Sequence, residues 1–360
     1  MKRDFILVVS RNRTDALVDA LTSLARLSTY TDFTVVVQDN SDTPLDVVIL
    51  RALQSRIPFI YVYNEKVLPM SENWNSGVER CLEEGADAVA ILADRRIATR
   101  HLLRAFNVLH INDADVVVFD HQTTWITTHG LRVGSNYQYS VSALEIESIE
   151  RDSFNCYFDG YTPRLFNCIT SSRYLRGVHG ALGTYVGGSS PDINFQARLA
   201  VHGSRLRPRL LKYDAPGIIT NSRHTHSSNG MNAQSSPKTS EFHQLSNPGY
   251  YPSDLEGLIV ATCLWEISHE SRADIERRVN WGQFFRHAIG ELRFQRSREV
   301  FDRLQTRLIR HAERICNTPA IQAEIVRRIR STSFSEPPRS RYDRVYEMPP
   351  TLELLGEIWA

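Results

Sequence analysis

Short apolar runs and segments of helical periodicity alternate through the first part of the chain, and this alternation restricts the fold more than any other feature. The apolar runs contain neither glycine nor proline and end in polar residues, which is typical of buried strands. They cover Phe5–Val9, Phe33–Val37, Phe59–Tyr63 and Ala88–Leu92. Strands that alternate with helices form mostly parallel sheets with helices on their faces. The sequence therefore predicts an α/β fold with a mostly parallel sheet and covering helices.

The segments between these runs carry apolar residues at helical spacing. We expect helices over 14–27 and 47–54 and a third helix that begins at Ser71. Thr14 is the expected N-cap of the first helix, because its hydroxyl can accept a backbone hydrogen bond. The residues expected on the inner faces are Leu17, Ala20, Leu21, Leu24, Trp74, Val78, Cys81 and Leu82.

The pattern becomes mixed after the first strands. A helix over 100–109 and a strand over 115–119 continue the alternation, and 122–212 then combines short strands with glycine-rich turns. Within this region a loop is expected to enter a helix, with Ser190 as its N-cap and Pro191 at the first helical position.

The last third of the chain predicts helices. The polar segment 221–240 is typical of a lid or a disordered segment. A capping box at Ser253–Glu256 and the pair Thr318-Pro319 each predict the start of a helix. We therefore divide the chain into an α/β domain (1–245), a helical appendage (246–335) and a tail rich in Pro and Arg (336–360).

Composition excludes several classes of function. The formal net charge is +1, so no overall field attracts nucleic acid, and no nucleic-acid partner is expected. The five cysteines are scattered without a Cys-x-x-Cys pair, which argues against a zinc site and a disulfide framework. No apolar stretch approaches the about 20 residues of a membrane-spanning helix, and the first apolar run is too short for a signal peptide. We therefore expect a cytoplasmic protein.

Glycine motifs that bind phosphate are absent from the sequence. No GxGxxG follows the first strand, and no GxxxxGK followed by Ser or Thr occurs, so a classical dinucleotide-binding domain and a P-loop are not expected. Polar residues instead follow three predicted strands, at Ser10–Arg13, Gln38–Asp42 and Asp94–Arg96. Because ligands of open α/β sheets bind outside the carboxyl ends of the strands, we expect a site at these residues.

These segments resemble, in order and spacing, the motifs of inverting family-2-type glycosyltransferases with the GT-A fold. The resemblance covers residues 4–225. The matching segments are Ser10–Arg13 (Thr-Tyr-Asn-Arg in the family), Val37–Ser41 (Val-Asp-Asp-Gly/Asn-Ser), Ser71–Gly77 (Ala-Arg-Asn-x-Gly), Asp94–Arg96 (Asp-x-Asp) and Ser190–Asp192 (an acidic catalytic base). The resemblance implies a Rossmann-like GT-A fold. It also implies transfer of a sugar from a nucleoside-diphosphate sugar, expected to be a UDP-sugar, to a carbohydrate or other hydroxyl acceptor with inversion.

The resemblance also assigns roles to single residues. Asp192 is the expected catalytic base, and the dipole of the helix that it begins should keep its carboxylate ionised at neutral pH. An aspartate at this position is equally expected because it stabilises a helix. Asp39 is similarly explained as a turn former, since Asp-Asn-Ser favours turns. Contacts to the donor nucleotide and its diphosphate are expected from Arg11, Arg13, Asp39, Asn75, Asp94, Arg95 and Arg96.

The chain departs from the family at the metal-binding motif. Only Asp94 remains, followed by Arg95 and Arg96, whereas Mn²⁺ or Mg²⁺ requires several oxygen ligands without adjacent positive charge. In one interpretation, Arg95 or Arg96 binds the diphosphate in place of the metal. In a second, Asp94 holds the metal together with His224 or His226. In a third, the protein is a non-catalytic nucleotide-sugar-binding or assembly protein.

Arginines outnumber acidic residues between Arg272 and Arg344, either as a solvated helical face or as a patch for a membrane surface or an acidic partner. The appendage then has three open roles: it forms a homodimer, makes a peripheral membrane contact, or closes over the donor. A nucleotidyltransferase is disfavoured, because Ser10–Thr14 contains no glycine for a phosphate loop.

Overall fold

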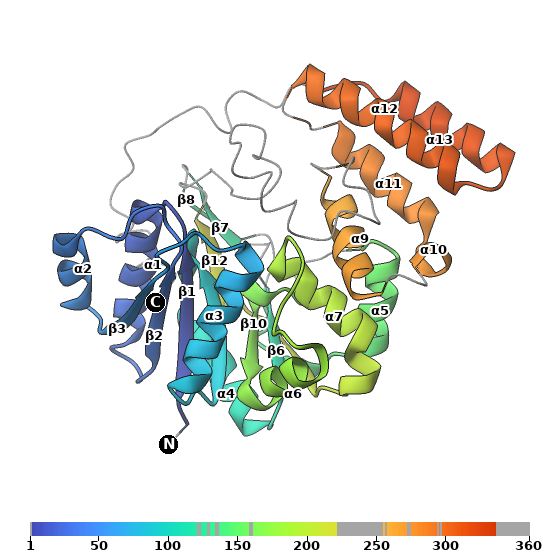
Figure 1. Ribbon diagram of the computed structural model, residues 1–360. Coiled ribbons are helices and arrows are strands. Elements are labelled where there is room, and N and C mark those ends of the chain that lie inside the picture. Colours follow the sequence, from blue (N-terminus) through green and yellow to red (C-terminus); the bar gives the residue numbers. More distant parts are fainter. Residues whose placement is uncertain are drawn as a thin grey trace. The chain divides into compact units, whose positions relative to one another are not determined.

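The structure is a computed structural model that describes residues 2–120, 124–127, 130–133, 137–157, 161–221, 255, 258–271, 275–293, 295 and 297–335. For residues 124–127, 130–133 and 221 it describes the backbone alone. Backbone contacts divide the chain into two compact units (Figure 1). Unit 1 contains the described residues up to 149 and from 161 to 221, and unit 2 contains 150–157 and the described residues from 255 to 335. The predicted boundary at residue 245 and the tail 336–360 lie outside the described residues, so our domain division stays a prediction.

Unit 1 is built on an eight-stranded mixed sheet with the order β3-β2-β1-β4-β10-β6-β11-β9 (Figure 1). Its strands are β1 (Asp4–Ser10), β2 (Thr34–Asp39), β3 (Phe59–Tyr63), β4 (Ala88–Ala93), β6 (Val116–Phe119), β9 (Val141–Ala143), β10 (Cys168–Ser171) and β11 (Leu210–Tyr213). β1 pairs in parallel with β2 and β4, and β2 with β3. β10 runs antiparallel to β4 and β6. The predicted α/β fold with a mostly parallel sheet is confirmed, and the reversed strand β10 is new.

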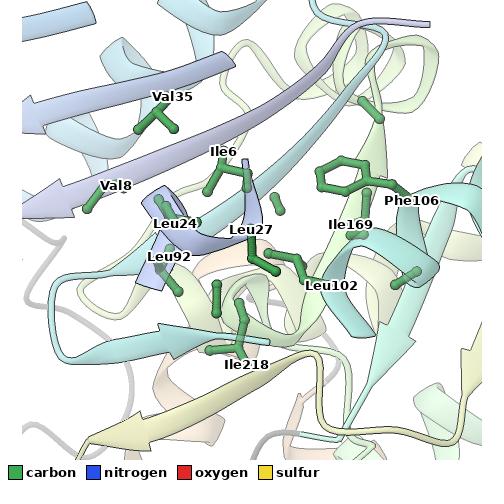
Figure 2. Close-up of a cluster of buried hydrophobic side chains, with 14 of the residues drawn as sticks. Ile6, Val8, Leu24, Leu27, Val35, Leu92, Leu102, Phe106, Ile169 and Ile218 are labelled. Carbon is green, nitrogen blue, oxygen red and sulfur yellow. The ribbon is translucent and has the colours of Figure 1, made fainter. Parts of the chain in front are cut away.

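Helices cover both faces of this sheet (Figure 1). They are α1 (Thr14–Leu27), α2 (Val47–Gln54), α3 (Met70–Glu83), α4 (Arg100–Ile111), α6 (Ser172–Leu182) and α7 (Pro191–Leu206), and α5 (Ile146–Phe154) spans the division between the units. Alternate residues of β1 face opposite sides. Ile6 and Val8 join the apolar cluster that contains residues of α1 and α4 (Figure 2), and Leu7 and Val9 join the cluster that contains residues of α3, α6 and α7.

Most local predictions for unit 1 are confirmed. The helices 14–27 and 47–54 and the strand 59–63 have their predicted bounds, and every predicted inner-face residue is buried. Ser190 is the N-cap of α7, and Pro191 is its first residue. Thr14 as an N-cap is wrong, because α1 already includes Thr14 and Arg13 is its N-cap. The side chain of Arg13 binds Asp94 instead of capping the helix.

A four-stranded second sheet has the order β5-β12-β7-β8. Its strands are β5 (Arg96–Ala98), β12 (Ile218–Asn221), β7 (Thr124–Thr127) and β8 (Gly130–Val133). β4 ends at Ala93 and β5 begins at Arg96, so Asp94 and Arg95 form the turn that joins the two sheets.

Unit 2 is helical and contains α9 (Ile259–Glu270), α10 (Ile275–Arg278), α11 (Trp281–Leu292), α12 (Arg298–Ile315) and α13 (Pro319–Ser331). The predicted start at Thr318-Pro319 is confirmed. The capping box lies outside the described residues apart from Leu255, and α9 begins later, at Ile259. The Glu291 carboxylate of α11 accepts hydrogen bonds from the backbone amides of Ile259 and Val260, so it caps α9. None of the helices in the described ranges is long and apolar enough to cross a membrane.

Candidate active site

The carboxyl ends of β1, β2 and β4 meet at one edge of the large sheet. Ser10 pairs with Asp39 in the register of β1 and β2, and Val9 pairs with Ala93 in that of β1 and β4. The polar residues that follow each strand are therefore neighbours in space. This places the predicted Arg11, Arg13, Asp39 and Asp94 together, as expected for ligand sites in open sheets.

Asp94 is buried, with 2% of its surface exposed, and protein donors occupy both of its carboxylate oxygens. Arg13 Nη1 donates to Oδ1 over 2.7 Å, in a charge-assisted bond. Ser10 Oγ and the backbone N of Arg11 donate to Oδ2 over 3.2 Å and 3.4 Å. The loop after β1 is thereby fixed to the end of β4.

A second set of bonds fixes the same loop to the end of β2. Asn12 adopts a left-handed conformation with φ of 54°, which asparagine tolerates better than most residues. Its backbone N donates to Ser41 Oγ over 2.8 Å, and its side-chain oxygen accepts from the backbone N of Asp42 over 2.9 Å. Arg11 forms an ion pair with Asp42 at 3.7 Å. The positions of Arg11 and Arg13 therefore depend on two neighbouring strands.

Asp39 is buried at the end of β2. Tyr61 OH donates to its Oδ2 over 2.7 Å, and the backbone N of Ser41 donates to its Oδ1 over 3.0 Å. The second bond is the side-chain turn expected of Asp-Asn-Ser. Burial, together with the hydrogen bond to Asp39, raises the pKa of Tyr61 above its usual value, so its hydroxyl stays a donor. The contact of Asp39 with a nucleotide stays a prediction.

A network of side-chain amides, buried or half-buried, lies beside Asp39, and no sequence pattern predicts it. Asn64 Nδ2 donates to Asn40 Oδ1 over 3.0 Å and to Asn73 Oδ1 over 2.7 Å. Gln38 Nε2 donates to Asn64 Oδ1 over 2.8 Å. The network ties the end of β2 to α3. Single asparagines carry no periodic signal, so only the fold could bring them together.

Arg95 and Arg96 differ in their surroundings. Burial, reinforced by Arg13, lowers the pKa of Arg95, and Asp94 opposes this change. Burial lowers the pKa of Arg96 to about 10, with further lowering by Arg95 and an opposite effect of Asp192. With a pKa of about 10, the guanidinium of Arg96 remains charged at neutral pH. Arg96 donates to Thr220 Oγ1, and its guanidinium lies 5.4 Å from the ring centroid of Phe166.

Asp192 lies in the first turn of α7 with 5% of its surface exposed. Burial raises its pKa, and this effect outweighs Arg164, Arg96 and the backbone hydrogen bonds of the first turn, which lower it. The helix dipole, from which the sequence predicted an ionised carboxylate, therefore lowers the pKa of Asp192 by less than burial raises it. Burial decides the direction, because a charged carboxylate loses solvation in the interior.

Arg164 is a site residue that the sequence did not reveal. It precedes a short 3-10 helix, Leu165–Asn167, that enters β10. Because β10 runs against its neighbours, its amino end lies at the edge where β4 and β6 have their carboxyl ends. Recognition of a reversed strand would have been the signal for this residue.

Asn75 was predicted to contact the donor, but its amide is occupied by the protein. Its Oδ1 accepts from the backbone N of Tyr185 over 2.8 Å and of Val186 over 3.0 Å. Its Nδ2 donates to the backbone O of Ser71 over 2.7 Å and of Val186 over 2.8 Å. Two donated and two accepted bonds use the full capacity of an asparagine amide.

Four guanidiniums and two carboxylates form a connected set of charges. We call Arg13, Arg95, Arg96 and Arg164 the arginine cluster. Each is linked to the next by an electrostatic interaction, with Asp94 beside the first two and Asp192 beside the last two. With both carboxylates ionised, the six groups carry two surplus positive charges. Such an arrangement suits an anion with two or more negative charges, since guanidiniums bind phosphate oxygens in bidentate geometry.

The residues around Asp94 do not fit a divalent cation. Both of its oxygens are hydrogen-bonded, and Arg13 and Arg95 place positive charge beside it. Within the described ranges, no group of three or more His, Cys, Asp and Glu side chains could hold a metal ion. His224 and His226 lie outside the described residues, so their role as ligands stays a prediction.

Comparison with solved structures finds TarS of S. aureus. The structure of its residues 1–349 is 15% identical, with a TM-score of 0.47, 91% of this chain covered and 90% of that chain. The same segment in complex with UDP-GlcNAc is 14% identical, with a TM-score of 0.46 and coverage of 91% and 90%. A longer TarS chain is 16% identical, with a TM-score of 0.48 and coverage of 91% and 55%.

Comparison with protein families finds a match over part of the chain, whereas no curated protein matches it. The match is to the family described as Glycosyl transferase family 2, and it covers residues 5–167. This segment contains β1, β2 and β4, the turn with Asp94, and Arg164. Residues 5–167 of this chain therefore match the model of Glycosyl transferase family 2.

Proposed function

We propose that the protein transfers a sugar from a UDP-sugar to an acceptor hydroxyl, with inversion at the anomeric carbon and without a metal ion. The proposal is supported most by the connected charges at the sheet edge. Asp94 is bound by Arg13 and is thereby unsuited to a cation, whereas Asp192 lies beside Arg96 and Arg164. A buried carboxylate next to several guanidiniums provides a base and an anion site in one place.

Asp192 is the proposed general base. The acceptor oxygen forms a bond to the anomeric carbon while the bond from that carbon to the diphosphate oxygen breaks. The hydroxyl proton passes to a carboxylate oxygen of Asp192. Attack from the face opposite the diphosphate inverts the configuration. Burial raises the pKa of Asp192 toward the working pH, which makes the carboxylate a stronger base while it stays ionised above that pKa.

The arginine cluster is the proposed binding site for the diphosphate. Negative charge grows on the departing diphosphate, and fixed cations that are already in position stabilise it without reorganisation. Arg95 and Arg96 adjoin Asp94 in sequence, and Arg96 interacts with both Arg95 and Asp192. The cluster therefore connects the leaving group with the base. No step of this mechanism requires a metal.

UDP release from UDP-sugars by the purified protein tests the proposal. We expect slow release that resists EDTA, falls about 100-fold or more in Arg95→Ala/Arg96→Ala, and is lost in Asp192→Asn. Arg51→Ala is the matched control, because Arg51 is exposed on α2. Once an acceptor is found, mass spectrometry would identify the glycosylated product, and NMR would report its anomeric configuration.

The other outcomes contradict distinct parts of the proposal. If release requires Mn²⁺ and tolerates the arginine substitutions, the metal-independent mechanism is wrong. The site would then hold a metal through Asp94 and ligands later in the chain. A rise in melting temperature with UDP, without release from any UDP-sugar across an acceptor screen, would assign the protein to nucleotide-sugar binding without catalysis.

A further inference from the structure

The loop that leads into Asp192 is held from both sides by hydrogen bonds. This entry loop covers residues 183–190, between α6 and α7. From α3, Asn75 makes three bonds to Tyr185 and Val186, and Glu79 accepts a hydrogen bond from Tyr185 OH. The entry loop therefore rests on the same helix that packs against β1 and β2.

The second set of bonds comes from α7 itself. Asn194 Oδ1 accepts from the backbone N of Gly187 over 2.8 Å. Arg198 Nη2 donates to Thr184 Oγ1 over 2.8 Å, and its Nη1 donates to the backbone O of Thr184 over 2.5 Å. Asn194 and Arg198 are both buried. The entry loop is thus attached to α3 at one side and to the body of α7 at the other.

We infer that Asn75 is a positioning residue that sets the place and the burial of Asp192 through the entry loop. This inference rests on the proposed role of Asp192 as the base. Asp192 follows the N-cap Ser190 by two residues, so a shift of the loop moves the first turn of α7 and its carboxylate. Displacement of a reacting group by about 1 Å can reduce a rate about 100-fold.

The saturation of the Asn75 amide separates this role from a donor contact. All four hydrogen-bonding positions of the amide are used within the protein, by Ser71, Tyr185 and Val186. A donor contact would have to displace one of these bonds. Loss of the side chain should therefore change catalysis more than donor affinity.

Steady-state kinetics and UDP affinity of the Asn75→Ala variant test the inference. We expect kcat to fall about 10- to 100-fold, with KM for the UDP-sugar and Kd for UDP within about twofold of wild type. The acid limb of kcat should move to lower pH. A loosened entry loop admits water to Asp192, and the burial that raises its pKa is partly relieved.

Two more variants keep the test decisive if Asn75→Ala folds poorly. Tyr185→Phe removes the bond to Glu79 and leaves Asn75 in place, so it should shift kcat and the acid limb in the same direction by a smaller factor. Asn112→Ala is the matched control. The Asn112 amide donates to the backbone O of Val108 at the end of α4, away from the entry loop, so the substitution should leave both quantities unchanged. Hydrogen exchange of the Tyr185 and Val186 amides should accelerate in Asn75→Ala.

Each contrary result has one meaning. A large rise in KM and in Kd for UDP with an unchanged kcat would make Asn75 a donor contact and overturn the inference. An unchanged kcat and pH profile, with faster exchange in the entry loop, would reduce Asn75 to a structural role. Absence of UDP release in the wild type would instead contradict the proposed function on which the inference rests.

Discussion

The carboxylate of Asp94 has two oxygen atoms, and both accept hydrogen bonds from protein donors. Arg13 binds one, and Ser10 with the backbone N of Arg11 binds the other. In this state the carboxylate compensates part of the positive charge of Arg13 and Arg95. Its contribution is then to organise the arginines, whereas a metal site would need its lone pairs for a cation.

Asp94→Asn separates these two roles. The amide oxygen can still accept from Arg13, and the loss of one negative charge leaves the arginine cluster with more surplus positive charge. We expect UDP binding to be retained or tightened and EDTA-resistant release to stay within about tenfold of wild type. Isothermal titration calorimetry measures the UDP affinity, and the UDP-release assay with EDTA measures the activity. A complete loss of UDP release at every donor concentration would contradict this expectation. It would indicate that Asp94 is a metal ligand.

Single residues also show where inference from sequence stops. The place of Asp192 in a first helical turn followed from Ser190-Pro191 and is observed. The direction of its pKa change did not follow, because burial depends on what packs around the helix. Asn75 was correctly placed on a helix near the expected site, but its partners, Tyr185 and Val186, lie far along the chain.

At the scale of elements, Gly77 allows α3 to approach β1 closely. A Cβ atom at Gly77 would lie 2.8 Å from Leu7 Cδ1 and 2.9 Å from Leu7 Cδ2, closer than side-chain atoms pack. Leu7 is fully buried and has little room to move. The close approach brings Asn75 to the entry loop and Asn73 to the amide network.

Gly77→Ala and Gly180→Ala should therefore change stability in opposite directions. Overpacking against Leu7 should lower the free energy of unfolding by about 1–3 kcal/mol in Gly77→Ala. Nothing lies within 4 Å of a Cβ built at Gly180, an exposed position inside α6. There the same substitution should raise the free energy of unfolding by about 0.5–1 kcal/mol. Urea denaturation of both variants measures the two effects, and equal signs would contradict the packing argument.

Elements with strong local patterns were predicted well, and elements defined by their neighbours were not. The helices over 14–27 and 47–54 have apolar faces that the sequence displays directly. The direction of β10 is a property of its pairing with β4 and β6, and no pattern within Cys168–Ser171 encodes it. Arg164 remained hidden for the same reason. The cap of α9 was also unpredictable, because Glu291 comes from another helix.

At the scale of the whole molecule, the chain divides into an α/β unit and a helical unit. Each buries its own apolar residues, with Phe284, Phe285 and Leu304 among those of unit 2. Chains of several units commonly unfold in more than one transition. Glu291 gives unit 2 its own dependence on pH. Burial raises its pKa from 4.5 to about 7, against the lowering effect of the amides that it caps.

In calorimetry at several pH values, the unfolding transition of unit 2 should therefore shift with pH through Glu291, and that of unit 1 should lack this shift. A carboxyl group with a raised folded pKa stabilises the fold fully below its unfolded pKa of 4.5, and this stability is lost as pH rises through about 7. We expect the transition of unit 2 to lose about 1–3 kcal/mol between pH 5 and pH 8. In Glu291→Gln, which keeps an acceptor oxygen but no charge, this loss should disappear. A pH-dependent loss that persists in the variant would assign it to other groups.

The order in which the site residues occur along the chain has a consequence for biosynthesis. Arg13 and Asp94 come early in unit 1, whereas Arg164 and Asp192 come from its last third. As the ribosome extends the chain from its amino end, β1 to β4 emerge while α7 has still to be made. An incomplete product that stops between Arg164 and Ser190 would contain all four residues of the arginine cluster but no base. Under the proposed mechanism, premature termination or proteolysis in this region leaves fragments that have no base to accept the proton of the acceptor hydroxyl.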